Sequence, residues 1–180
     1  MEGCYKKYSR EDCDSAENER IQSNLDQPAT QHNYTKIGFK KVKVPDNLWT
    51  SIQDFWNMNK HLNLSEEWGI GSIYTNHWES PTSMVSLYDG NLRGAGASSI
   101  LRDRIYMFVK PILEAWIQKP LRATSLYGIR VYHHHAVLAT HIDRLPLVTS
   151  CIINVAQDVD EPWPVEVYSH DGKAYNVTME

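Results

Sequence analysis

Cysteine is scarce in this 180-residue sequence, which has only Cys4, Cys13 and Cys151 and no CxxC pair. An odd number at these spacings predicts neither a disulfide framework nor a zinc-binding motif. Cys151 stands in an apolar run, which favours a buried free thiol. A reducing environment is therefore expected for the chain.

Long apolar runs and excess positive charge are missing as well. No stretch approaches the roughly 20 residues of a transmembrane helix. Residues 1–15 lack the apolar core of a signal peptide, so a cytoplasmic location is the default expectation. With 18 Lys and Arg against 22 Asp and Glu and no basic stripe, the sequence argues against nucleic-acid binding. Sequons for N-glycosylation begin at Asn33, Asn63 and Asn176, and these matter only in a secreted protein.

The first third of the chain combines a polar start with one strand pattern and one helix pattern. Residues 1–35 are expected to form a polar N-terminal extension, with a solvated helix near 9–25. Residues 36–44 alternate with the period of a strand. A helix is predicted where five residues recur at helical spacing, four of them apolar: Leu48, Ile52, Phe55, Trp56 and Asn59. Asp46 is expected to cap that helix.

The remainder, up to Glu180, is expected to complete one domain over residues 36–180. Short strands are predicted at 70–78 and 83–88, followed by a helix at 99–118 that Pro111 should kink or split. From Thr124 onward strand patterns dominate, and Asp171-Gly172 is typical of a tight turn. The strand patterns read SLYGIRVY, AVLATHID, LVTSCIINVA, PVEVYS and KAYNVTM. Helices early and antiparallel strands late indicate an α+β domain built on a sandwich or barrel.

The motif HID at positions 141–143 is the first candidate for chemistry. On a strand, residues two apart point to the same face, so His141 and Asp143 would project side by side. A neutral imidazole nitrogen and a carboxylate oxygen are two members of the two-His-one-carboxylate triad that binds Fe(II). By spacing alone the motif is unspecific, because a hydrogen-bonded surface pair has the same pattern.

The surrounding segment, 124–180, resembles the catalytic domain of the prolyl 4-hydroxylases, especially an algal group of them. These belong to the iron- and 2-oxoglutarate-dependent dioxygenases. The matching pieces, in the family's order, are IRVY, THID, SCIINV, the acidic stretch DVDEPWP and VEVY. Tyr132 precedes His141 by nine residues, as the resemblance requires.

The resemblance implies a double-stranded β-helix (jelly-roll) core with flanking N-terminal helices. It implies iron held by His141 and Asp143, with 2-oxoglutarate, O₂ and L-ascorbate as further cofactors. Tyr132 matches the family residue that hydrogen-bonds the distal carboxylate of 2-oxoglutarate, although a core aromatic residue would look the same. The implied reaction hydroxylates a C–H bond, typically C4 of proline in a peptide or protein partner.

Two departures from the family pattern limit this expectation. Glu166 or a neighbour stands where the family has a Thr, and an acidic side chain would not favour a carboxylate ligand. The family's distal His ligand, and the Lys or Arg that pairs with 2-oxoglutarate, follow a PGD segment beyond Glu180. The jelly roll is therefore expected to be incomplete at the C-terminus, with weak or no turnover. His170 is a poor substitute because it lies at a predicted turn.

Two alternatives stay open at this point. A non-catalytic jelly-roll module could bind a peptide or partner through an open sheet edge. A cupin-type metal protein could use the run His133–His135, although the position of the run in a loop favours simple loop polarity over metal binding. His77 is expected to be a satisfied structural histidine, and Arg130 and Arg144 are expected to pair with local carboxylates.

Overall fold

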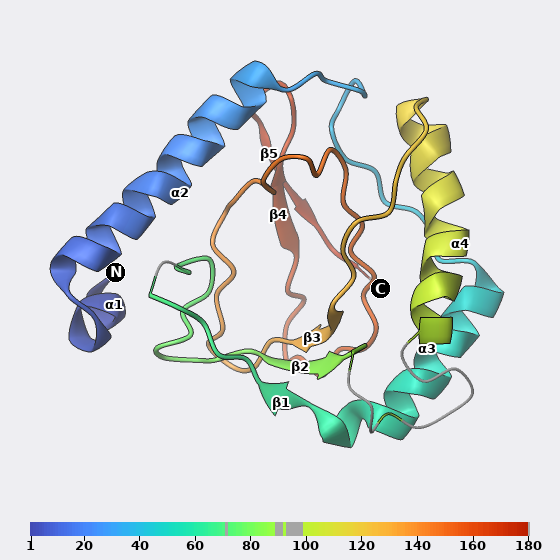
Figure 1. Cartoon of the computed structure of the whole chain (residues 1–180), viewed down its shortest axis with the longest axis horizontal. Coiled ribbons are helices and arrows are strands. Elements are labelled where there is room, and N and C mark those ends of the chain that lie inside the picture. Colours follow the sequence, from blue (N-terminus) through green and yellow to red (C-terminus); the bar gives the residue numbers. More distant parts are fainter. Residues whose placement is uncertain (71, 89–91, 93–98, 180) are drawn as a thin grey trace. The chain divides into compact units, whose positions relative to one another are not determined.

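A computed structural model describes residues 1–70, 72–88, 92 and 99–179 of the chain (Figure 1). Within them the chain forms two compact units, each assembled from three separate segments. The first unit comprises Met1–His32, His61–Ser86 and Gly128–Pro146. The second comprises Asn33–Lys60, Leu87–Tyr127 and Leu147–Glu180. The two units are described separately below.

The first unit begins with two helices joined by a disulfide bond. Helix α1 spans Glu2–Lys7 and α2 spans Arg10–Thr30. The Ser9 hydroxyl accepts a hydrogen bond from the backbone N–H of Asp12 and thereby caps α2. Cys4 and Cys13 are fully buried and bonded to each other, so the expectation of no disulfide is wrong. An odd number of cysteines does not exclude a disulfide, because one pair can be bonded while the third, Cys151, stays free.

A three-stranded antiparallel sheet completes the first unit. Its order is β1 (Leu64–Ser65), β2 (Ser83–Ser86) and β3 (Gly128–Val131). A short 3-10 turn, Lys60–Leu62, leads into β1. Gly128 is required at the start of β3, because a Cβ there would lie 2.3 Å from the carbonyl oxygen of Val85.

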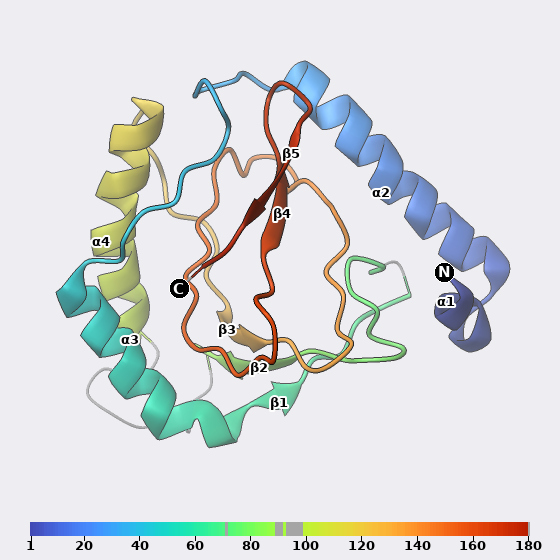
Figure 2. The same cartoon turned by 180° about the vertical axis from the view of Figure 1, so that it is seen from behind.

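The second unit holds two helices that lie side by side, as both views show (Figures 1 and 2). Helix α3 spans Asp46–Asn59 and α4 spans Ser99–Ile117. The predicted apolar stripe of α3 is confirmed, since Leu48, Ile52 and Phe55 are buried. Asp46 is the first helical residue rather than the cap, and its carboxylate pairs with Lys43 at 2.7 Å. Helix α4 continues through Pro111 without splitting, although its apolar face is mostly half-buried.

A two-stranded hairpin, β4 (Val165–Tyr168) and β5 (Ala174–Val177), is the other regular part of the second unit. The predicted turn is confirmed: Gly172 has a φ of 76°, and its N–H donates to the carbonyl of Ser169. One face of the hairpin is partly covered, and Tyr175 on it meets the ring of Phe39 at 5.2 Å. The opposite face carries the exposed residues Glu166, Tyr168, Ala174 and Asn176.

Four of the predicted strands are wrong. Residues 36–44 form no strand, because Gly38 turns the chain with a φ of 96° and Ile37 is half exposed. Among the described residues, segments 70–78 and 136–143 form no strand and pair at one isolated bridge, Thr75 to Leu138. Residue 71 lies outside the described residues. Segment 147–156 is irregular as well. Alternation alone cannot form a strand, because a strand also needs a neighbour of matching length and register.

The described part of the chain is thus a mixture of helices with small antiparallel sheets that do not close on themselves. A jelly-roll core therefore remains a prediction from the family resemblance. None of the helices in these residues is long and apolar enough to cross a membrane.

Candidate functional site

The segment that carries His141 is irregular, yet it is fixed at three consecutive residues. The N–H of Ala139 donates to the carbonyl of Tyr74 at 2.7 Å. The Tyr74 ring then meets the His141 ring edge-on, with centroids 5.1 Å apart. Exposure alternates along the motif, with His141 and Asp143 exposed and Ile142 half-buried. The predicted strand is absent, so the placement of His141 and Asp143 on one side stays a prediction.

Helix α2 fixes the middle of this segment by hydrogen bonds to its backbone. The side chains of Arg20 and Asn24 both donate to the carbonyl oxygen of Thr140, the residue before His141. Arg20 is itself oriented by two hydrogen bonds to the carboxylate of Glu17, at 2.8 and 2.9 Å. These bonds raise the pKa of the Arg20 guanidinium and lower the pKa of Glu17. Helix α2 therefore supports the segment that carries the candidate site. Its polar composition had predicted only a solvated helix.

The His141 ring has a defined tautomer. Its Nδ1 lies 2.8 Å from the carbonyl oxygen of Ala139, which can only accept, so Nδ1 carries the proton. In the neutral imidazole the lone pair is then on Nε2, as in metal-ligating histidines whose other nitrogen donates to a carbonyl. Asp143 is exposed two residues away and offers a carboxylate.

A complete metal centre is not assembled among the described residues. No group of three His, Cys, Asp or Glu side chains in that part of the chain is close enough to hold an ion. His170, which the sequence makes a poor substitute ligand, and Glu166, which stands at the family's Thr position, both belong to the second unit. The N–H of His170 donates to Ile37, and its ring packs against Gly38. His141 and Asp143 thus remain a predicted pair of ligands.

Tyr132, the predicted 2-oxoglutarate residue, lies beside a network on the three-stranded sheet. Arg130 on β3 donates to both carboxylate oxygens of Glu66, at 2.6 and 2.9 Å. Thr82 donates to the same carboxylate at 2.6 Å, and the Arg130 guanidinium lies over the Trp68 ring. The bond to Glu66, and to a smaller extent one to Tyr132, raises the pKa of Arg130. Arg130 is therefore paired with a local carboxylate, as predicted.

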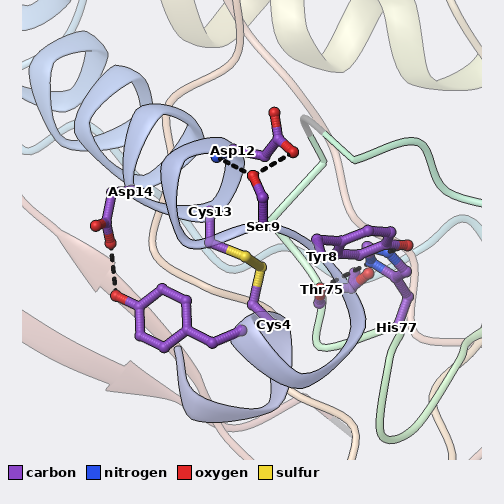
Figure 3. The surroundings of a disulfide bond; sticks show 9 residues. Cys4, Tyr8, Ser9, Asp12, Cys13, Asp14, Thr75 and His77 are labelled. Carbon is purple, nitrogen blue, oxygen red and sulfur yellow. Dashed lines mark hydrogen bonds between the residues drawn. A yellow bond between two sulfur atoms is a disulfide. The ribbon is translucent and has the colours of Figure 1, made fainter.

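His77 is a satisfied structural histidine, as predicted (Figure 3). Its Nδ1 lies 3.3 Å from the carbonyl of Thr75, and its Nε2 lies 3.0 Å from the Tyr8 hydroxyl. Since the carbonyl can only accept, the Tyr8 hydroxyl donates to Nε2. The residue is buried, which lowers the pKa of the imidazole, and the positive charge of Lys7 lowers it further. Tyr8 thus joins the disulfide region to the segment that follows β1.

Stability should depend on pH through His77. Its folded pKa lies below the unfolded value of about 6.5, so the unfolded chain binds more protons in between. We expect the contribution of His77 to the free energy of unfolding to be constant above about pH 6.5 and to be lost as the pH falls from there through the folded pKa. Urea unfolding from pH 5 to 8 measures this. His77→Gln should flatten that part of the profile, while His134→Gln at an exposed position should leave it intact. An unchanged profile in His77→Gln contradicts the assignment.

The run His133–His135 divides between two roles. His133 Nε2 lies 2.9 Å from the hydroxyl of Ser83, so this ring is engaged with β2. His134 and His135 are exposed, with ring centroids 3.8 Å apart, and His135 has a φ of 64°. The chain turns at these residues, which agrees with the loop interpretation. Cys151 is exposed, so its predicted burial is wrong.

Sequence reasoning missed the residues that support the His141 segment, namely Arg20, Asn24 and Tyr74. No local signal could have found them, because the helical pair is 116 to 120 residues away from Thr140. Comparison of the chain with family models, with curated proteins and with solved structures finds no match.

Proposed function

We propose that this chain carries part of the site of an iron- and 2-oxoglutarate-dependent dioxygenase of the prolyl 4-hydroxylase type. His141 and Asp143 would be two of the iron ligands, and Tyr132 would bind 2-oxoglutarate. The reaction class is hydroxylation of a C–H bond, with a proline-containing peptide as the substrate class. The observation that carries the proposal is the His141 ring, whose Nδ1 donates to a backbone carbonyl.

The donor set fits iron in part. One imidazole with its lone pair on Nε2 and one exposed carboxylate are the right donors for Fe(II). The third protein donor of a facial triad is absent from the described residues, so we assign no catalytic step to this chain. When bound, Fe(II) with 2-oxoglutarate would supply O₂ activation. The chain's own contribution is to orient the His141 segment through Tyr74, Arg20 and Asn24.

The proposal predicts a measurable metal affinity that depends on His141. Under anaerobic conditions, His141→Ala and Asp143→Ala should each weaken Fe(II) binding at least about tenfold, because each removes one of two protein donors. His134→Ala is the matched control, since it removes an exposed imidazole of the same region. Isothermal titration with Fe(II), and with Mn(II) as a redox-inert probe, gives the affinities. Equal affinity in wild type and His141→Ala would refute the assignment.

A second candidate, a peptide-binding module, rests on the β4–β5 hairpin. Ser169 donates to Lys173, so the backbone groups of Glu166, Tyr168, Ala174 and Asn176 point away from the partner strand. No third strand pairs with them among the residues that the structure describes. Such edges can accept an extended peptide by strand addition. Peptide binding that survives both His141→Ala and chelation of metal would favour this candidate.

A further inference from the structure

We infer that this chain is a substrate for N-glycosylation, with Asn33, Asn63 and Asn176 as the acceptors. Each begins an Asn-X-Ser/Thr sequon without proline at the middle position. The inference concerns modification of the chain and does not depend on the proposed iron site. Three structural observations support it: the disulfide, the exposure of all three asparagines, and the orientation of Asn176.

The disulfide points to the compartment in which the glycosylation machinery works. Cys4 and Cys13 are bonded to each other (Figure 3). Both are fully buried, within an apolar cluster that includes Ile73 and Ala16. Disulfides persist in oxidising compartments such as the endoplasmic reticulum lumen and are rare in the cytosol. N-linked glycans are likewise found on secreted proteins. The bonded pair and the sequons therefore indicate the same environment by independent chemistry.

All three acceptor side chains are exposed in the folded chain. Asn33 lies in an irregular segment after α2, and Asn63 is the irregular residue directly before β1. A bulky solvated glycan at these positions extends into water without displacing a buried side chain. In the first sequon the Thr35 hydroxyl accepts a hydrogen bond from the Gly38 N–H at 3.0 Å. This bond does not involve Asn33, so a glycan on Asn33 leaves it in place.

Asn176 has the most informative position, because it lies on a strand. Side chains of β5 alternate between the two faces of the hairpin. Tyr175 points to the face that meets Phe39, whereas Asn176 points to the opposite face with its cross-strand neighbour Glu166. Of the two orientations available on a strand, this one leaves room for a glycan. A shift of one residue would have directed the glycan against Phe39.

The reaction requires a lipid-linked oligosaccharide diphosphate as the donor. A bond forms between the side-chain Nδ2 of asparagine and the anomeric carbon of the sugar. The bond from that carbon to the phosphate oxygen breaks, the amide nitrogen loses one proton, and the lipid diphosphate leaves. No oxidant or reductant is needed.

The test uses the full chain, translated behind a cleavable secretion signal in the presence of microsomes. Protease protection identifies the molecules that reached the lumen. We expect those molecules to carry three glycans, each removable by an endoglycosidase. Asn33→Gln, Asn63→Gln and Asn176→Gln should each remove one glycan. Thr178→Ser should keep the glycan at Asn176, while Thr178→Ala should lose it.

A matched control is Asn47→Gln, because Asn47 is also an exposed asparagine but lacks a hydroxyl two residues later. It should retain all three glycans. Protease-protected chains with the mass of the bare polypeptide overturn the inference as a whole. A single Asn→Gln variant with an unchanged number of glycans overturns it for that position. Glycan transfer precedes folding, so a variant that folds poorly still reports on its sequon.

Discussion

Replacing Cys4 and Cys13 together by alanine should lower the free energy of unfolding of the first unit by about 2.6 kcal/mol. This value is the loop-closure entropy for a separation of nine residues, because the cross-link restricts the unfolded chain. Urea unfolding followed by tryptophan fluorescence measures it, since Trp78 packs against the cluster around the disulfide. Loss of the buried sulfur atoms adds a smaller cavity cost in the same direction.

The matched control for this prediction is Cys151→Ala, at an exposed position in the second unit, which should change stability by no more than about 0.5 kcal/mol. Wild-type protein unfolded in the presence of a strong reductant should resemble the double variant. A double variant as stable as the oxidised wild type would mean that the bond does not constrain the unfolded chain.

Local patterns predicted those elements whose stability comes from nearby residues. The stripe of Leu48, Ile52 and Phe55 sufficed for α3, because a helix satisfies its own backbone and needs only one buried face. The hairpin β4–β5 was predictable because its turn, Asp171-Gly172, brings two adjacent strands into register. In both cases the necessary partners lie within a few residues.

Elements with distant partners could not be predicted from their own sequence. Segment 136–143 alternates like a strand, but its β-pairing is limited to one bridge between Leu138 and Thr75, so no ladder of hydrogen bonds forms. The disulfide depends on a turn between α1 and α2 that brings Cys4 to Cys13, which no count of cysteines reveals. In the candidate site, too, one part was predictable from the local sequence and the other was not. The spacing of His141 and Asp143 is local, whereas the hydrogen bonds from α2 depend on tertiary structure.

Glu66→Ala should be the other strongly destabilising change, with an expected loss of about 2–3 kcal/mol. The Glu66 carboxylate accepts hydrogen bonds from two N–H groups of Arg130 and from the hydroxyl of Thr82. The Glu66 side chain is 15% exposed. Removing the carboxylate leaves a partly buried guanidinium and a buried hydroxyl without this acceptor. The free-energy cost of these unpaired groups exceeds the net stabilisation that the ion pair itself provides. The loss is set below the 3–5 kcal/mol of a fully buried pair because Arg130 is 30% exposed.

A double variant separates two contributions to the free energy of unfolding: the cost of leaving one charge unpaired, and the stabilisation that the ion pair provides. Glu66→Met with Arg130→Met should recover most of the stability, because apolar side chains of similar volume replace both partners. Lys43→Ala is the control: this lysine pairs with Asp46, both side chains are 84% exposed, and the change should stay within about 0.5 kcal/mol. Urea is the suitable denaturant, since guanidinium chloride would screen both pairs. If Glu66→Ala proves as mild as Lys43→Ala, Glu66 does not fix Arg130. In that case Arg130, whose side chain also hydrogen-bonds Tyr132, would give that tyrosine no fixed partner.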